Sequence, residues 1–505
     1  MGDPMSVWLT LTLHYTLQLG VLLRALTRPD REPASRLAWM LVILGVPVAG
    51  ALLYLMLGEV SPGRRRSALM QKVRKALPVT VPGVDAPATL PAEARGAFAR
   101  GAVVNGFAPV PGNTARLLGD SDAAIDAMVA DIDAARSSVH VLVYIWLDDA
   151  NGGKLMAALA RAAQRGVVCR VMVDGLGSRR LLRCERFRAM QAAGVKTGVA
   201  FSTRWAAARL LLGRIDIRNH RKLFVIDGQI AYVGSQNCAD PAFAIKAAYG
   251  PWVDIMLRFE GPVVWQTQAL FAADWMGQGG DDMAALLAAP APPVAGGFPA
   301  LVFGSGPDLS VNAVPDVVGL LLAAAQDEVV ISTPYFVPTQ GLQEQLRATA
   351  LRGVRVVLIL PARNDLAHGG LGEPRGLCVA DRRGRGHSRI HAGAVARQDA
   401  DGGWRAGPDR LGQSGPPQFR AELRELAAAG GRRGDRRDPR APAGLSCAER
   451  GRARGCGCAL VIGLAAAVQQ CGDDQSGLVR PATEKPGVAV EQGTAGSVFQ
   501  PFTNA

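Results

Sequence analysis

The chain opens with two apolar stretches, residues 7–23 and 37–57, each long enough to cross a membrane as a helix. The second contains no charged residue, whereas the first includes three Thr residues, one Gln, His14 and Tyr15. We predict two transmembrane helices, and a buried core helix is the alternative for each stretch. No Lys or Arg precedes the first stretch, which argues against a secretory signal peptide. Basic residues flank both stretches, so the positive-inside rule only favours a cytoplasmic body.

Further along, apolar positions alternate between helical and strand spacing, and the same order occurs twice. The first series is a helix at 123–135, a strand at 139–146, a helix at 155–164 and a strand at 167–173; the second is a helix at 317–325, a strand at 329–333, a helix at 342–351 and a strand at 354–360. Residues 163–167 and 350–354 share Arg-Gly-Val, and Tyr144 and Tyr335 stand at matching strand ends. Any two βα units look partly alike, but these shared residues favour a duplicated α/β fold with helices on both faces of its sheet.

A short stretch in the middle of the chain combines polar side chains with a predicted β-hairpin. His220, Lys222 and Asp227 are spaced as HxKxxxxD, and on an extended strand His220 and Lys222 leave the same face because they are two residues apart. The apolar residues 223–226 predict a buried strand, and Asp227 with Gly228 predicts a tight turn before the returning strand.

The same hairpin brings Ser235 and Asn237, the polar residues of a GSxN sequence, toward the imidazole and the ammonium. Lys and amide donors hold phosphate oxygens, and a His side chain can attack phosphorus or transfer a proton. This set of groups therefore suits an anionic phosphate. Isolated strand residues beside an ordinary turn are the alternative, but six positions at fixed spacing argue against it.

Charge and cysteine content change the picture only slightly. The 505-residue chain has a formal net charge of +13 and a pI near 9.8, which favours an anionic partner, although an Arg-rich C-terminal third supplies much of this charge. Its eight cysteines lack CxxC…CxxC spacing, and Cys456 and Cys458 form a lone CxC. Neither a zinc site nor a disulfide framework is predicted.

The pattern HxKxxxxDxxxxxxGSxN, matched in full from His220 to Asn237, resembles the catalytic motif of the phospholipase D superfamily. Two N-terminal spans before the body resemble the bacterial cardiolipin synthases of that superfamily, as do the stretches at 144–149, 251–262, 271–275 and 333–338. The resemblance implies phosphatidyl transfer between two phosphatidylglycerols, with release of glycerol, through a phosphohistidine. It implies no metal and no cofactor.

The resemblance also implies roles for individual residues. His220, Lys222 and Asp227 would be catalytic, and Ser235 and Asn237 would bind the substrate phosphate. Whether His220 is the nucleophile or the general acid stays open. A further candidate is Asp254, as a carboxylate that orients an active-site His, with a surface ion pair as the alternative role.

The chain departs from the superfamily pattern in its last third. In the superfamily two HxKxxxxD motifs, one per half, meet in one active site, so a second motif is expected near residue 400. It is absent, because His368, His387 and His391 all lack the following Lys and Asp, and residues 366–458 are rich in Arg, Gly, Pro and Ala. A disordered basic tail is one interpretation.

A shifted reading frame is the other interpretation of this region. Residues 396–404 permit codons that read His-Ala-Lys-Thr-Leu-Thr-Val-Asp-Gly when the first base is dropped, which restores HxKxxxxD at the expected place. In the same frame residues 409–416 can yield Leu-Ile-Gly-Ser-Ala-Ser, close to GSxN. We favour a frameshift between residues 366 and 390.

The expected fold class is therefore α/β, a duplicated phospholipase D-type mixed sheet flanked by helices, preceded by two transmembrane helices and followed by a disordered C-terminal third. Five regions are expected: a two-helix membrane anchor at 1–62, a basic juxtamembrane linker at 63–110, a first half at 111–285, the start of a second half at 286–365, and an out-of-frame tail at 366–505.

The expected partners are anionic phospholipid, specifically phosphatidylglycerol, and the membrane, with no nucleic acid. The expected location is the inner membrane, as a multi-pass protein with a cytoplasmic catalytic body. Two alternatives stay open. One is a hydrolytic phospholipase or nuclease, for which a basic groove would suit nucleic acid. The other is a membrane-anchored pseudoenzyme that binds anionic lipid without turnover, and the absence of the second motif supports it.

Overall fold

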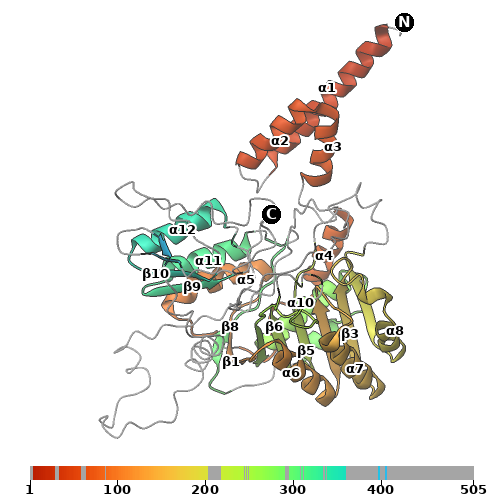
Figure 1. The fold of residues 1–505 in the computed structure, drawn as a ribbon, viewed down its shortest axis with the longest axis vertical. Coiled ribbons are helices and arrows are strands. Elements are labelled where there is room, and N and C mark those ends of the chain that lie inside the picture. The colour runs from red at the N-terminus through yellow and green to blue at the C-terminus, as the bar shows by residue number, and fades with distance from the viewer. Residues whose placement is uncertain are drawn as a thin grey trace, which may run out of the picture.

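The computed structural model describes most of the chain up to residue 359 and two short strands beyond it. The described residues are 4–28, 33–58, 64–85, 87–202, 218–243, 245, 247, 250–289, 295–306, 309, 310, 312–333, 336, 338–359, 396–398 and 404–406. Apart from the two strands, the tail expected from residue 366 lies outside them, as do His368, His387 and His391. Figure 1 shows a group of helices projecting from an α/β body.

Three apolar helices precede the body: α1 (Pro4–Thr27), α2 (Pro33–Gly45) and α3 (Pro47–Leu57). The first, α1, is long and apolar enough to cross a membrane, as predicted for residues 7–23. The single helix predicted at 37–57 is wrong, because the chain bends between α2 and α3. Pro47 has no N–H to continue the helical bonding, and Val46 leaves the helical region with φ −133° and ψ 76°, as residues before proline tend to do.

The body is built on an eight-stranded mixed sheet with strand order β4-β3-β2-β5-β6-β7-β1-β8. Its strands are β1 (Val110–Leu117), β2 (Ser138–Val143), β3 (Val168–Asp174), β4 (Lys196–Ala200), β5 (Leu223–Ile226), β6 (Ile230–Gly234), β7 (Met256–Glu260) and β8 (Phe298–Ala300). The strands β2, β3 and β4 pair in parallel, and the others pair antiparallel. At the junction Val141 of β2 lies between Val171 of β3 and Phe224 of β5. The hairpin that follows the motif is therefore central in the sheet.

Helices cover both faces of this sheet, as predicted for an α/β fold. On one face lie α6 (Ser121–Ala134), α7 (Ala150–Gln164) and α8 (Glu185–Ala192), and on the other lies the buried helix α10 (Val263–Met276). Strand β2 is buried along its whole length, with Val141 in the α6–α7 core and Leu142 in the α10 core. Short 3-10 helices lie at Ala92–Ala94, Leu181–Arg183 and Ala284–Ala288.

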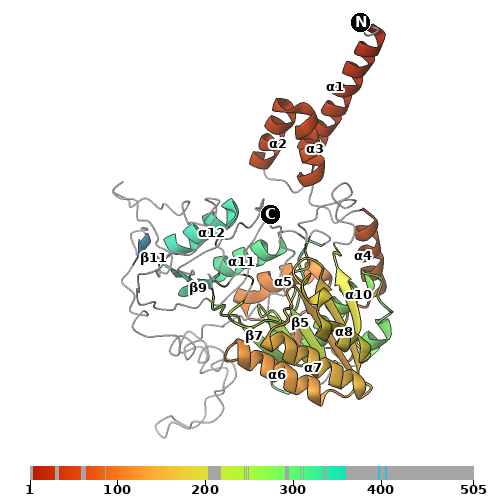
Figure 2. The ribbon, with the colours of Figure 1, turned by 45° about the vertical axis from the view of Figure 1, so that its right-hand side comes forward.

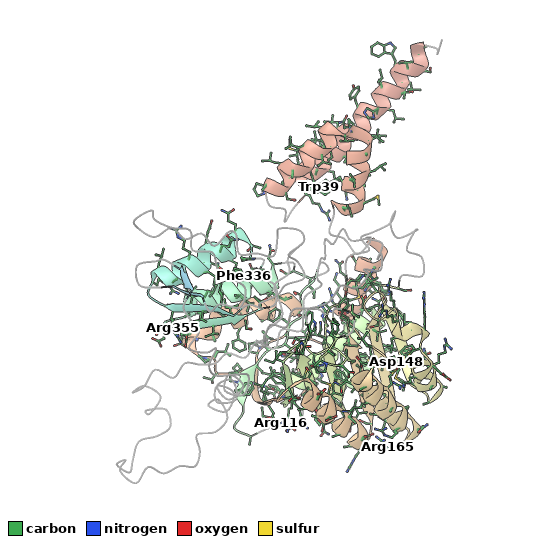
Figure 3. All side chains as sticks on the ribbon, in the orientation of Figure 1. Trp39, Arg116, Asp148, Arg165, Phe336 and Arg355 are labelled. Carbon is green, nitrogen blue, oxygen red and sulfur yellow. The ribbon has the colours of Figure 1, made fainter. Side chains whose placement is uncertain are left out.

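A second, smaller unit follows along the chain, and Figure 2 shows it beside the main sheet. It contains α11 (Ala313–Ala324), β9 (Glu328–Ser332), α12 (Gln340–Leu351) and β10 (Arg355–Ile359), with β9 and β10 parallel as β2 and β3 are. Strands β11 (Ala396–Gln398) and β12 (Trp404–Ala406) extend its sheet antiparallel. Phe336 packs with Leu342 and Leu346 in its core (Figure 3). Tyr335, the expected counterpart of Tyr144, lies outside the described residues.

Two equivalent arginines show the duplication in atomic detail. Arg165, directly after α7, donates from Nη2 to the carbonyl of Ile132 near the end of α6 at 3.0 Å. Arg352, directly after α12, donates from Nη2 to the carbonyl of Leu322 near the end of α11 at 2.7 Å. Each arginine precedes a glycine with positive φ, the left-handed conformation common just after a helix. The repeated Arg-Gly-Val therefore makes the same contact in both halves.

The region expected to be a basic linker, 63–110, contains two helices that pack on the body. Helix α4 (Arg64–Ala76) buries Val73 and Leu77 in the α10 core. Helix α5 (Arg95–Asn105) packs against α11 of the second half, where Arg100 donates to Asp316 at 2.8 Å. The chain between anchor and sheet is thus part of the folded body.

Candidate active site

The motif lies at one end of a short antiparallel hairpin, as predicted. The four residues of β5 are all buried, and β5 pairs with β6 in a register that sets Ile226 opposite Ile230. Asp227 and Gly228, at the centre of the turn, have φ of 52° and 66°. Two successive positive φ values are the backbone of a type I′ turn, whose twist matches that of the strands it joins. The hairpin therefore holds the residues before β5 in a fixed place.

His220 and Lys222 meet at the open end of this hairpin, just before β5 begins. Lys222 is fully buried and His220 is 8% exposed. Lys222 Nζ lies 3.0 Å from His220 Nδ1 and donates to the His220 carbonyl oxygen at 2.9 Å. The ring of Tyr144, from the loop after β2, packs on the imidazole with centroids 4.5 Å apart. The two side chains share one face, although they lie outside the regular strand.

Burial sets the protonation of this pair. Desolvation and then the charge of Lys222 hold the pKa of His220 well below its ordinary value. Desolvation also lowers the pKa of Lys222, and the nearby carboxylate of Asp254 opposes that effect. At neutral pH the imidazole is therefore uncharged, with a lone pair on one ring nitrogen.

Ser235 and Asp254 form a second polar contact beside the pair. The Ser235 hydroxyl donates to Asp254 Oδ1 at 2.7 Å and accepts the N–H of Ile255 at 3.0 Å. Burial raises the pKa of Asp254, whereas the bond from Ser235 and the charge of Lys222 act to lower it. Asp254 was expected to orient a histidine; in the structure its hydrogen-bond partner is Ser235.

Asn237 holds the loop that carries Tyr144. Its Oδ1 accepts the N–H of Ile145 at 3.1 Å, and the adjacent Cys238 donates its N–H to the Ile145 carbonyl at 3.1 Å. These bonds dock residues 144–147 beside the hairpin. In this arrangement Asn237 fixes the wall of the site next to His220.

The structure brings His220 and Lys222 together but does not bring Asp227 to them. The four residues of β5 intervene, about 13 Å of extended chain. Asp227 accepts the backbone N–H groups of Arg136, Ser137 and Ser138 at 2.8–2.9 Å, and the Ser137 hydroxyl at 2.8 Å. Partial burial acts to raise its pKa, but these hydrogen bonds outweigh it and the pKa lies below its ordinary value. Asp227 therefore ties the turn to the start of β2.

Sequence reasoning missed a buried polar network on the opposite side of the motif. Arg221 alternates with His220 and Lys222, and its guanidinium donates from Nη1 to Asp274 on α10 and from Nη2 to the Ser305 carbonyl at 3.2 Å. Asn219 donates from Nδ2 to the same carboxylate at 3.0 Å. In an extended chain alternate side chains point to opposite faces, so Asn219 and Arg221 point away from His220 and Lys222. This alternation could have revealed the second polar group from the sequence.

Within the described residues no group of three or more His, Cys, Asp or Glu side chains gathers as a metal site would.

Two family models match the chain. The model "Phospholipase_D-nuclease N-terminal" covers residues 17–59, and "Cardiolipin synthase, PLD-like domain" covers 128–275. A cardiolipin synthase A of Escherichia fergusonii is 33% identical over 375 residues, 71% of this chain and 75% of the relative. The chain belongs to the cardiolipin synthase family.

A second relative, the cardiolipin synthase A of Cronobacter sakazakii, is 34% identical over the same shares of both chains. The cardiolipin synthase domain at 128–275 contains the motif, Tyr144, Asp254 and Asp274, so the site described above lies inside the matched domain. Among solved structures, the phospholipase D family member Nuc from Salmonella typhimurium matches 33% of this chain and 95% of its own, with 16% identity and a TM-score of 0.24. A match of that size says nothing about the substrate.

Proposed function

We propose that this protein transfers a phosphatidyl group between two phosphatidylglycerols, giving cardiolipin and glycerol. The observation that carries the proposal is an uncharged, buried imidazole with an ammonium 3.0 Å from its ring nitrogen, inside a cardiolipin synthase domain. A phosphodiester needs both groups: an unprotonated nucleophile and a fixed cation for its oxygens.

In this mechanism His220 is the nucleophile, because its lowered pKa keeps a ring lone pair available at neutral pH. An incoming phosphate oxygen competes with the imidazole for the Lys222 ammonium and so frees the ring nitrogen. That nitrogen attacks phosphorus, the bond from phosphorus to the glycerol oxygen breaks, and the departing oxygen takes a proton from a general acid. The hydroxyl of a second phosphatidylglycerol then attacks the phosphohistidine, loses its proton to the same group and releases His220.

The remaining candidate residues take supporting roles in this proposal. Ser235 and Asn237 line the phosphate site, with Asn237 also holding the Tyr144 loop. Asp227 acts by fixing the hairpin on which the catalytic pair stands, and Asp254 acts on the charge of Lys222. No step requires a metal or a cofactor.

The general acid would come from the second half, which is the part of the chain that departs from the family pattern. We propose that the division into a first half at 111–285 and the start of a second half at 286–365 holds, with a shifted reading frame after residue 365 that removes the second HxKxxxxD motif. The chain with the present sequence would then bind lipid but lack the acid for the leaving group. Losing general acid catalysis alone costs a factor of about 10² to 10⁴ in rate.

The experiment compares the present chain with a restored-frame variant, in membranes, on phosphatidylglycerol with a labelled headgroup. We expect the restored variant to form cardiolipin and glycerol, and His220→Ala within it to abolish both products. The control is His140→Gln, because His140 is also buried but lies on β2 against α10. Cleavage of DNA without headgroup transfer would identify a nuclease instead. Full synthase activity from the present sequence would refute both the frameshift and the two-histidine mechanism.

A second candidate function fits the sequence as it stands, because the second motif is absent from it. A membrane-anchored protein that holds anionic lipid without turnover needs only one phosphate site. Binding of phosphatidylglycerol vesicles by the present chain, unchanged activity after frame restoration, and no labelled phosphohistidine would together favour it.

A further inference from the structure

The bend between α2 and α3 leaves both helices too short to cross a membrane. Helix α1 has 24 residues, about 36 Å of helix, whereas α2 has 13 and α3 has 11, about 20 Å and 17 Å. A bilayer core is about 30 Å thick. Figures 1 and 2 both show the bend turned away from the body, and the N-terminal part of α1 extending past it.

A polar contact from α1 completes the bend. In a continuous helix the N–H of residue 47 would bond the carbonyl of Ile43, but Pro47 has no N–H. Gln18, in the middle of α1, donates from Nε2 to that carbonyl at 3.0 Å. In lipid an unsatisfied carbonyl costs several kcal/mol, so a glutamine here stabilises the bend where water is absent. The contact also sets the bend level with the middle of α1.

Tight packing at the bend leaves an apolar outer surface. A side chain at Gly50 would meet the Val42 carbonyl oxygen at 2.2 Å, so only glycine allows α3 to return along α2 so closely. Ile43 and Tyr54 are buried with Ala25 of α1. The outward residues are large and apolar, and each is more than half exposed: Leu41, Leu44, Val48, Leu52 and Leu55.

The basic residues around these helices conflict with two full spans. Four arginines lie between the two apolar stretches, at 24 in the last turn of α1 and at 28, 31 and 36 after that helix, and six basic residues follow α3, at 64, 65, 66, 72, 74 and 75. Two full spans would put these groups on opposite sides of the membrane, against the positive-inside rule. Before α1 the only charged side chain is Asp3.

We propose that α2 and α3 form a re-entrant hairpin, which enters the bilayer from the side of the catalytic body and returns to that side. Helix α1 is then the one complete span among the described helices, with its N-terminus on the far side. Both basic groups meet the cytoplasmic leaflet, whose anionic lipids attract them. Arg36 donates to the Arg28 carbonyl at 3.0 Å and so joins the end of α1 to the start of α2 on this side. The partner of this surface is the hydrocarbon core of the bilayer.

The test locates three sites in the full chain. Every cysteine is replaced by alanine, and single cysteines are introduced as Gly2→Cys, Ser35→Cys and Ser67→Cys. A membrane-impermeant maleimide is applied to spheroplasts and to inverted inner-membrane vesicles. We expect Gly2→Cys to react in spheroplasts, and both Ser35→Cys and Ser67→Cys to react only in inverted vesicles. Reaction of the sites at 35 and 67 from opposite sides would overturn the proposal.

A second variant tests the cause of the bend. Pro47→Ala restores the missing N–H and permits one helix of roughly 25 residues, which is long enough to span. We expect a measurable fraction of Ser67→Cys to react in spheroplasts in the Pro47→Ala background. Pro33→Ala is the matched control, because a proline at the first position of a helix leaves no bond to restore. Identical labelling of both variants would overturn the role of Pro47.

Discussion

Substitution of Asp227 can show whether this motif residue serves the stability of the fold or the catalytic chemistry. It belongs to the catalytic motif by spacing, yet its carboxylate accepts three backbone N–H groups and one hydroxyl at the start of β2. Replacing it with alanine removes all four acceptor contacts and leaves alanine at a φ of 52°. We therefore expect Asp227→Ala to weaken the fold, while the His220–Lys222 pair keeps its chemistry.

The expected magnitude follows from these contacts. A hydrogen bond to a charged group contributes about 1.5–3 kcal/mol. Water reaches this turn and replaces most of each bond, so we expect a loss of about 2 kcal/mol from all four together. Alanine in the left-handed region adds about 1 kcal/mol. A total near 3 kcal/mol corresponds to a fall of about 6–12 °C in Tm for a half of this size.

The pH dependence has a definite sign. The folded-state pKa of Asp227 lies below its value in the unfolded chain, which is about 3.9. Its stabilisation is therefore fully present above that pH and is lost as pH falls through the folded-state value. The Tm difference between the wild type and Asp227→Ala should shrink in acid.

The assay is thermal unfolding of the full chain in detergent, followed by tryptophan fluorescence. Asp133→Ala is the matched control, because Asp133 makes exposed ion pairs with Arg161 at 2.7 Å and Arg165 at 3.9 Å and should change the free energy of unfolding by under about 1 kcal/mol. Activity per folded molecule is measured in the restored-frame variant. An unchanged Tm together with lost activity would refute the structural role and indicate that Asp227 takes part in catalysis.

Two further expectations concern buried charge. Arg221→Met leaves the Asp274 carboxylate buried without its cation, and we expect the free energy of unfolding, measured in urea, to fall by about 3–5 kcal/mol. The double variant with Asp274→Leu should recover part of this loss. Equal losses in the single and double variants would contradict the pairing. His140 has its pKa lowered to about 3 by burial and by Arg170, so the unfolded chain takes up a proton that the folded chain does not. Stability should therefore fall as pH drops below about 6.5, and His140→Gln should reduce that fall in a series of Tm values against pH.

Features set by local periodicity could be predicted from the sequence. His220 and Lys222 meet because a spacing of two aims both side chains to one side, and the apolar run between Lys222 and Asp227 is long enough for a strand and no more. The Arg-Gly-Val repeat likewise predicted the duplication, and the structure shows its arginines making equivalent contacts in both halves. The same spacing argument, carried further, would have placed Asp227 one strand length from the catalytic pair.

Features set by packing between distant elements could not be predicted. Arg221 and Asp274 are 53 residues apart and meet only because α10 lies across the sheet beneath the motif. The contact of Ser235 with Asp254 depends on the register of β6 with β7. The bend at Pro47 could have been predicted from the proline, but the uncharged stretch at 37–57 has the length of one membrane-spanning helix and was interpreted as one.

The packing of α5 on α11 has a consequence for the order in which the protein is made. Arg100 and Asp316, which pair across this contact, are separated by 216 residues. At 5–20 residues per second a ribosome needs roughly 10–40 s to pass from one to the other. During that interval Ala97 and Val104, which end up buried against Val314 and Val317, have no partner and lie a short chain length from the membrane anchor. A defect that prevents α11 from folding therefore leaves the apolar residues of α5 exposed, although α5 is made more than 200 residues earlier.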